Sequence, residues 1–119
     1  MPTKDEHVLQ ARHNRQFWFS HNLDTTPYRD WVVTGIFYEA VHWVEAFLAG
    51  KGTHPNTHGQ RNAEMSRYSE LDQILVDYDV LKADSENARY ACYLHTAEDI
   101  RNDIVPMLTK IEAHVLPLL

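Results

Sequence analysis

Apolar residues recur every three or four positions along most of this 119-residue chain, which is the spacing of one helix face. The pattern is clearest over residues 27–49, where six apolar positions are expected to form a stripe facing the core. These six are Val33, Phe37, Ala40, Val41, Val44 and Leu48. A neighbouring stripe carries Thr34, Tyr38, His42 and Glu45, with Glu39 beside it. The segment is therefore predicted to be a largely buried helix with a separate polar stripe.

The same spacing predicts further helices before and after this one. They span residues 4–21, 57–68, 69–88 and 96–116. Thr3 is placed to cap the first helix and Thr96 to begin the last, which Pro106 is expected to kink. Residues 89–95 are expected to be a frayed helix end or a loop. The fold class predicted is all-α, an antiparallel bundle of four to five helices forming one domain over residues 1–119.

Six aromatic residues fall at helical spacing and are predicted to lie in the core, not to form a platform for stacked bases. They are Phe17, Trp18, Phe19, Trp31, Phe37 and Trp43. Leu9 is expected to face inward with them. Two small basic patches, Arg12 with Arg15 and Arg61 with Arg67, are expected on solvated faces.

Composition narrows the classes of function. The chain has 11 Lys and Arg against 17 Asp and Glu, and the formal net charge of -6 weighs against nonspecific nucleic-acid binding. The single cysteine, Cys92, allows no internal disulfide and favours a reducing compartment. The chain starts without the apolar stretch of a signal peptide, and the apolar segment 31–48 carries Glu39, His42 and Glu45. We therefore expect a cytoplasmic protein that does not cross a membrane.

Two segments together carry a resemblance to a known family. The first is the aromatic helix YEAVHWVEAFLAGKG, which starts at Tyr38 and is followed by His54-Pro55 and His58. The second is Tyr78-x-x-Leu81-x-x-x-Ser85-x-x-Ala88-Arg89-Tyr90. This combination resembles the HEPN domains, small helical proteins of toxin–antitoxin, antiphage and RNA-processing systems. The resemblance implies a HEPN-like bundle that forms a homodimer, with a nucleotidyltransferase-type antitoxin as a possible partner.

The HEPN resemblance also implies a pair of candidate catalytic residues. Arg89 and His95 match the family's arginine and histidine, which stand four to six residues apart. In the family, two such pairs meet across a dimer interface, where histidine acts as a base and arginine stabilises charge on the phosphate during metal-independent RNA cleavage. Here Tyr90 follows the arginine, as in HEPN-like members whose arginine holds the bundle together. The favoured prediction is a non-catalytic interaction module or a nucleotide- or RNA-binding module, and the alternative is a ribonuclease.

Six residues are candidates for binding. They are Tyr38, His42, His54, His58, Arg61 and Tyr90. His54 and His58 are expected to cap the third helix and to hydrogen-bond its turn. Glu39-x-x-His42 is half of a di-iron bundle motif, but the chain holds no second copy. A three-histidine site of His42, His54 and His58 stays open as an alternative, which makes a metal-dependent bundle enzyme a distant possibility. No metal or other cofactor is expected.

Overall fold

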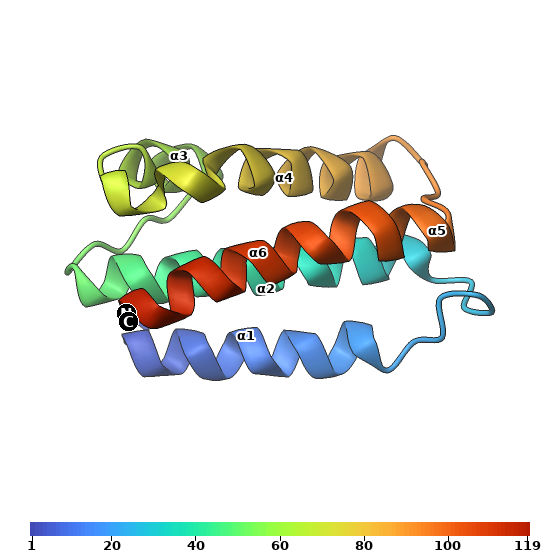
Figure 1. The fold of residues 1–119 in the computed structure, drawn as a ribbon, viewed down its shortest axis with the longest axis horizontal. Helices are drawn as coiled ribbons and strands as arrows, with labels where there is room; N and C mark the ends of the chain where they lie inside the picture. The colour runs from blue at the N-terminus through green and yellow to red at the C-terminus, as the bar shows by residue number, and fades with distance from the viewer.

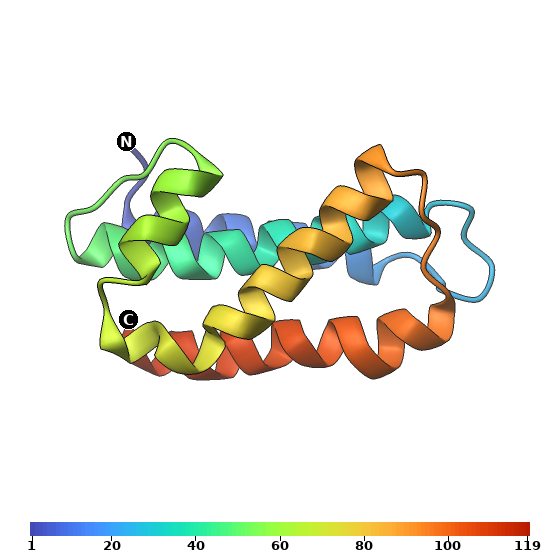
Figure 2. The ribbon, with the colours of Figure 1, turned by 90° about the horizontal axis from the view of Figure 1, so that it is seen from above.

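A computed structural model describes residues 1–119 and confirms the all-α prediction, with helices and no strand. Helices α1 (Lys4–Phe19), α2 (Arg29–Gly50) and α6 (Val105–Val115) run along the length of the molecule, and α4 (Leu75–Tyr90) crosses them obliquely (Figures 1 and 2). The short helix α3 (His58–Met65) lies at the end of the bundle where α2 finishes. Four shorter helical segments complete the chain. They are the 3₁₀ helix η1 (Ser69–Ile74), α5 (Ala97–Asp99), the π-helix η2 (Ile100–Ile104) and the 3₁₀ helix η3 (Leu116–Leu118).

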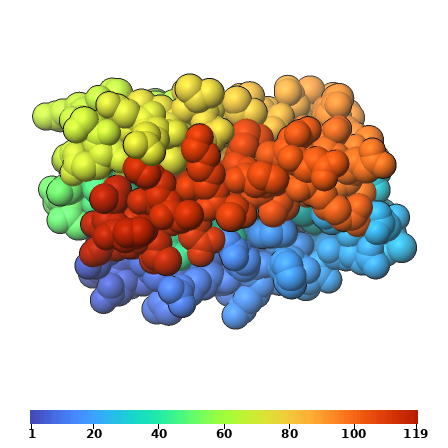
Figure 3. Space-filling model, in the orientation of Figure 1, coloured from blue at the N-terminus to red at the C-terminus, as the bar shows by residue number.

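Helix α2 is the centre of the molecule. All six residues of its predicted core stripe are buried, as expected. Figure 3 shows how α6 fills the space between α1 and α4 on one face and covers much of α2. By length and hydropathy α2 is also the one helix that could cross a membrane, but 72% of its apolar window is buried inside the bundle. That degree of burial is what the core helix of a helical bundle shows.

Close approach of α1 to α2 depends on Gly35. A Cβ added at Gly35 would lie 3.2 Å from the Cβ of Trp18 and 3.3 Å from Cδ2 of Phe17. This is tighter than ordinary van der Waals contact, so the absent side chain lets α1 sit directly against α2. In this packing, the indole Nε1–H of Trp18 donates a hydrogen bond to Oε1 of the buried Glu39 at 2.8 Å.

The prediction that six aromatic residues lie in the core is confirmed for Trp18, Phe37 and Trp43. It is wrong for the other three, because Phe17, Phe19 and Trp31 are 48%, 74% and 52% exposed. Leu9, also expected inside, is 68% exposed. The reason is that α1 buries a single narrow face, made by His7, Ala11 and Trp18. Leu9 is two residues from both His7 and Ala11 and so points away from that face. Trp31 lies on the polar stripe of α2 and not on its core stripe.

The predicted helix ends are largely confirmed, and proline changes the last helix. Thr3 caps α1 and forms a capping box with Glu6, and Thr96 accepts a hydrogen bond from the backbone N–H of Asp99 at 3.0 Å. The predicted fifth helix is divided into α5, the π-helical turn η2 and α6. Pro106 stands just after η2. Because its ring has no N–H and crowds the carbonyl four residues earlier, a wider turn before it relieves the clash.

Helix α4 continues two residues beyond the predicted end and includes Arg89 and Tyr90. It stops because Cys92 adopts a left-handed conformation with φ of 55°. The backbone N–H groups of Ala91 and Tyr93 then donate to the carbonyl of Asn87 at 3.1 and 3.2 Å. This turn sends residues 93–96 away from the direction of the helix.

Replacing Cys92 with glycine is expected to raise the free energy of unfolding by up to about 1 kcal/mol, because a Cβ in the left-handed region costs roughly 1–2 kcal/mol and the entropic cost of glycine offsets part of it. Urea unfolding of Cys92→Gly measures the gain. Cys92→Ala keeps the Cβ and should leave stability nearly unchanged. A lower stability for the glycine variant would show that the conformation of Cys92 is not strained.

Candidate functional site

A buried polar cluster joins α1, α2 and α3, and we call it the histidine–arginine cluster. It consists of His7, His42, Glu45, His58 and Arg61. The Nδ1 atoms of His7 and His42 lie 3.0 Å apart, and Nε2 of His7 lies 3.3 Å from Oε2 of Glu45. Arg61, which is 8% exposed, donates to Oε1 of Glu45 at 2.8 Å and to Nδ1 of His58 at 2.8 Å. One carboxylate therefore bridges the N-terminal helix and α3.

The hydrogen bonds of the cluster assign its protons. Arginine only donates, so Nδ1 of His58 accepts and carries a lone pair. Nε2 of His7 faces a carboxylate and so carries the proton, which leaves its Nδ1 to accept from Nδ1–H of His42. Burial lowers the pKa of His7 and lowers the pKa of His42 to about 4. Burial also lowers the pKa of His58, and the positive charge of Arg61 lowers it further. All three imidazoles are therefore neutral at pH 7.

The cluster contains half of the predicted binding residues. His42, His58 and Arg61 belong to it, and Tyr78 of α4 lies against it, where burial raises the pKa of the phenol to about 12. His54 makes no hydrogen bond there, although its charge lowers the pKa of His7. The predicted capping role of His54 and His58 is wrong. Helix α3 is capped by Thr57, whose hydroxyl accepts from the backbone N–H of Gln60 at 3.0 Å.

Tyr38 and Tyr90 lie around Arg89 instead. The guanidinium carbon of Arg89 stands 5.5 Å from the ring centre of Tyr38 and 5.1 Å from that of Tyr90, so the cation lies against two aromatic faces. The Tyr38 ring also lies 6.2 Å from that of His58, which connects this group to the histidine–arginine cluster. Arg89 makes no ion pair with a carboxylate, and its buried Nη1 atom has no hydrogen-bond partner.

Arg89 and His95 are held in different surroundings within one protomer. Arg89 lines a pocket of about 330 Å³ with Asp30, whereas His95 lines another of about 370 Å³ with Asp84. His95 is 6% exposed, and its Nε2 lies 3.5 Å from Oδ1 of Asp84. Only Tyr93 lines both pockets. A shared catalytic cleft is therefore not formed by the two side chains of one chain.

A second carboxylate in the interior is that of Glu39 on α2. It is fully buried and accepts hydrogen bonds from Arg15 at 2.8 Å and from the indoles of Trp18 and Trp43 at 2.8 and 2.9 Å. Arg15 also pairs with Glu112 of α6. The expectation of a solvated face is wrong for Arg61, which is buried against Glu45, whereas the side chain of Arg15 is 39% exposed and reaches the buried Glu39 from the surface. The sequence signal that was available is the position of Arg15, four residues after the buried Ala11.

The residues considered for metal binding are directed to different partners. Glu39 faces Arg15 and two indoles, while His42 faces His7. No group of three or more His, Cys, Asp or Glu side chains is arranged to hold a metal ion. The arrangement of His42, His54 and His58 therefore does not form the three-histidine alternative.

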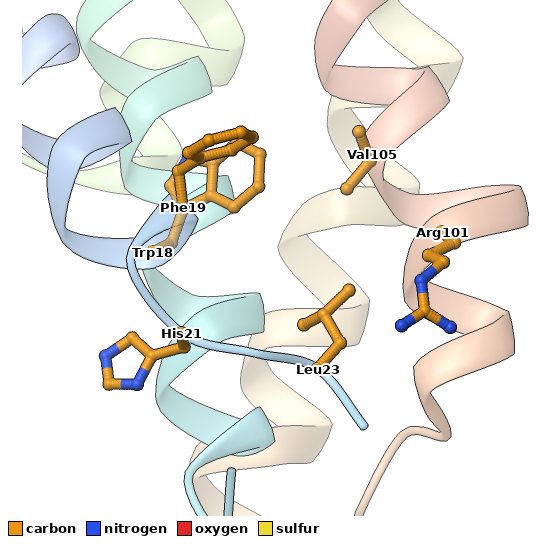
Figure 4. A pocket seen from close by; sticks show the side chains of 6 residues that line it. All are labelled: Trp18, Phe19, His21, Leu23, Arg101 and Val105. Carbon is orange, nitrogen blue, oxygen red and sulfur yellow. The ribbon is translucent and has the colours of Figure 1, made fainter. Parts of the chain in front are cut away.

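An apolar pocket of about 280 Å³ lies between the end of α1, the loop after it and α6 (Figure 4). It is lined by Trp18, Phe19, His21, Leu23, Arg101 and Val105. Arg101 donates to Asp24 at 2.7 Å, so the one cation of the pocket is already neutralised. The pocket contains none of the predicted site residues.

No protein-family model, curated protein or solved structure gives a significant match to this chain.

Proposed function

We propose that this protein is a HEPN-like, non-catalytic interaction module that forms a homodimer through an aromatic surface. The observation that carries this proposal is a group of large exposed side chains where α2 begins and α4 ends, which we call the aromatic end. It consists of Tyr28, Trp31, Tyr90, Tyr93 and Leu94, which are between 52% and 78% exposed. Exposed clusters of aromatic and aliphatic side chains are typical of protein interaction sites.

The chain itself holds the two halves of the aromatic end together. Nε of Arg29 donates to the carbonyl of His95 at 2.8 Å, which fixes the loop after α4 against the start of α2. Figure 2 places the end of α4, in orange, beside the start of α2, in cyan, and residues of both helices line one pocket. The surface is thus built on two helix ends and does not depend on a free loop.

A second copy of the chain suits this surface because it carries both signs of charge. Arg89 and Asp30 line the same pocket. In a two-fold contact, the Arg89 of each copy can lie opposite the Asp30 of the other, as a self-complementary interface requires.

The charges favour a protein partner over RNA. Seven of the eleven lysines and arginines pair with carboxylates of the same chain. The four others are Lys4, Arg12, Arg29 and Arg89, which are divided between α1 and the aromatic end. RNA binding needs a continuous row of free cations to displace counterions. The proposal includes a cytoplasmic location, which the single cysteine favours, and a nucleotidyltransferase-type partner, which the HEPN resemblance implies.

Replacing Trp31 and Tyr90 together with serine is expected to weaken self-association at least about tenfold, because both side chains lose their buried area in the dimer. Sedimentation equilibrium on the wild-type chain and the double variant measures this change. The matched control replaces Leu9 and Val76 with serine, since they are 68% and 74% exposed away from the aromatic end.

The proposal expects a wild-type dimer, a control that stays dimeric and a Trp31→Ser/Tyr90→Ser variant that dissociates. A wild-type protein that stays monomeric at all accessible concentrations would contradict it. Equal weakening in both double variants would also contradict it, because general surface hydrophobicity would then explain the association.

A metal-independent ribonuclease is the second candidate. The observation in its favour is that both nominated catalytic residues carry a buried atom without a hydrogen-bond partner, Nη1 of Arg89 and Nδ1 of His95. Unsatisfied buried polar atoms are uncommon and often mark functional positions. This candidate requires the dimer to bring Arg89 and His95 of two chains into one cleft, and it predicts RNA cleavage in EDTA that His95→Ala abolishes.

A further inference from the structure

A pocket lined mainly by hydrogen-bond acceptors lies between the last turns of α4, the loop after it and the start of the C-terminal helices. We call it the acceptor pocket, and its volume is about 370 Å³, within the range of small-molecule sites. Its polar and aromatic lining consists of Asp84, Asn87, Tyr93, His95, Asp99 and Asp103. Apart from Tyr93, none of these residues belongs to the aromatic end.

No lysine or arginine balances the carboxylates of this pocket. Asp84 has only His95 as an ion-pair partner, at 3.5 Å, and Asp99 and Asp103 form no ion pair. No lysine or arginine lines the pocket. Burial raises the pKa of Asp84, and the negative charges of Asp103 and Asp99 add to this while His95 opposes it. Three mutually repelling carboxylates are thus gathered in one cavity with His95 as their one basic neighbour.

His95 provides an independent sign of a missing partner. The residue is 6% exposed, and its Nδ1 atom is buried without a hydrogen-bond partner. Nε2 of the ring faces the Asp84 carboxylate at 3.5 Å, so Nδ1 is the ring nitrogen that is left without a partner. The ring of Tyr93 packs edge-on against the imidazole, with ring centres 4.7 Å apart, and forms an aromatic wall that is 52% exposed.

We propose that the acceptor pocket binds an organic cation that ends in an amine or a guanidinium group. Its three carboxylates can only accept hydrogen bonds, and ammonium and guanidinium groups only donate them. The Tyr93 ring adds a face that attracts cations. A metal ion would need several ligands converging on one point, an arrangement that these side chains do not form. A guanidinium or a diamine can reach acceptors that stand further apart.

Two sources offer this chemistry, a free diamine or guanidine and an arginine side chain of a partner protein. Calorimetric titration with agmatine tests the first, and titration with N-acetyl-arginine-amide tests the second. N-acetyl-citrulline-amide is the neutral control, since it has the shape of the blocked arginine without its charge. Tighter binding of agmatine would indicate a free cation as the natural ligand, and tighter binding of blocked arginine would indicate a partner's side chain.

The variant Asp99→Asn/Asp103→Asn removes two charges from the pocket, and Asp5→Asn/Asp72→Asn removes two from exposed positions elsewhere. We expect saturable one-to-one binding to the wild-type protein, about tenfold or greater weakening in the pocket variant, and little change in the control variant. The imidazole resonances of His95 should shift on binding, and citrulline should not bind. Circular dichroism confirms that both variants keep the helical fold.

Two results would overturn this proposal. One is the absence of saturable binding of either cation up to about 10 mM. The other is equal weakening in both double variants, which would reflect general attraction to an acidic protein. The substituted carboxylates lie outside the aromatic end, and Tyr93 is the one residue that the two sites share. A protein that stays monomeric would leave the acceptor pocket open and would not change the expected result.

Discussion

Replacing Glu39 with glutamine is expected to lower the free energy of unfolding by about 2 kcal/mol or more, because a buried donor that loses its acceptor costs about 1–3 kcal/mol, and more when the lost partner is charged. Glu39 is fully buried at the point where α1, α2 and α6 meet. Its two oxygens accept from Arg15 and from the indoles of Trp18 and Trp43. All of these partners are donors.

Glutamine has nearly the same shape but brings a second donor in place of one oxygen. Its amide N–H₂ must then face the Arg15 guanidinium or an indole N–H, so at least one buried donor loses its acceptor. The native state of a domain is typically stable by only 5–15 kcal/mol, and a loss of this size would remove a large part of it. Urea unfolding followed by far-ultraviolet circular dichroism measures the change.

Glu112→Gln is the matched control for this prediction. Glu112 pairs with the same Arg15 but its side chain is 26% exposed, so water can replace the lost contact. We expect this variant to lose less than about 1 kcal/mol. Similar losses in Glu39→Gln and Glu112→Gln would contradict the central role given to the buried carboxylate, as would a loss below about 1 kcal/mol in Glu39→Gln.

Lowering the pH from 7 to 4 is expected to destabilise the protein, and His42 should account for up to about 3 kcal/mol of the loss. Burial lowers the pKa of His42 from 6.5 to about 4 in the folded protein. Below pH 6.5 the unfolded chain therefore binds a proton at His42 that the folded protein does not bind. The part of the unfolding free energy that is linked to His42 is fully present above pH 6.5, decreases as the pH falls, and is lost near pH 4. The lowered pKa values of His7 and His58 act in the same direction.

The slope of unfolding free energy against pH between 4 and 6.5 isolates this effect from the absolute stability of each variant. His42→Asn should reduce the slope, because the titrating group is gone. His13→Asn is the control at an exposed position of α1 and should keep the wild-type slope. An unchanged slope in His42→Asn would show that the imidazole of His42 does not resist protonation in the folded state.

The sequence predicted the elements of this fold because helical periodicity and capping are local properties. The core stripe of α2 and the caps at Thr3 and Thr96 were all readable from spacing and residue type. Helical periodicity did not predict which positions of each stripe are buried by neighbouring helices. The polar stripe of α2 is exposed to solvent at Trp31, but further along the helix, at His42, it takes part in a buried hydrogen-bond network.

The spacing of residues along the chain did not predict which polar side chains pair when they are distant in sequence. Arg15 and Glu39 are 24 residues apart, and His7 and His42 are 35 apart. Each was recognisable as a polar residue on a helix face, but the pairing depends on how α1 packs on α2. The spacing of Arg89 and His95 was also insufficient, because the left-handed Cys92 turns the chain before it reaches His95.

Incubation of the wild-type protein with a mixed RNA pool in EDTA tests the non-catalytic proposal most directly. The assay uses protein concentrations at which sedimentation shows the association state, and compares wild type with His95→Ala and Arg89→Ala prepared identically. The account predicts no cleavage by the wild-type protein above the level of the two variants. Cleavage by the wild-type protein that both substitutions abolish, with folding and self-association intact, would contradict the account and establish a ribonuclease that uses Arg89 and His95.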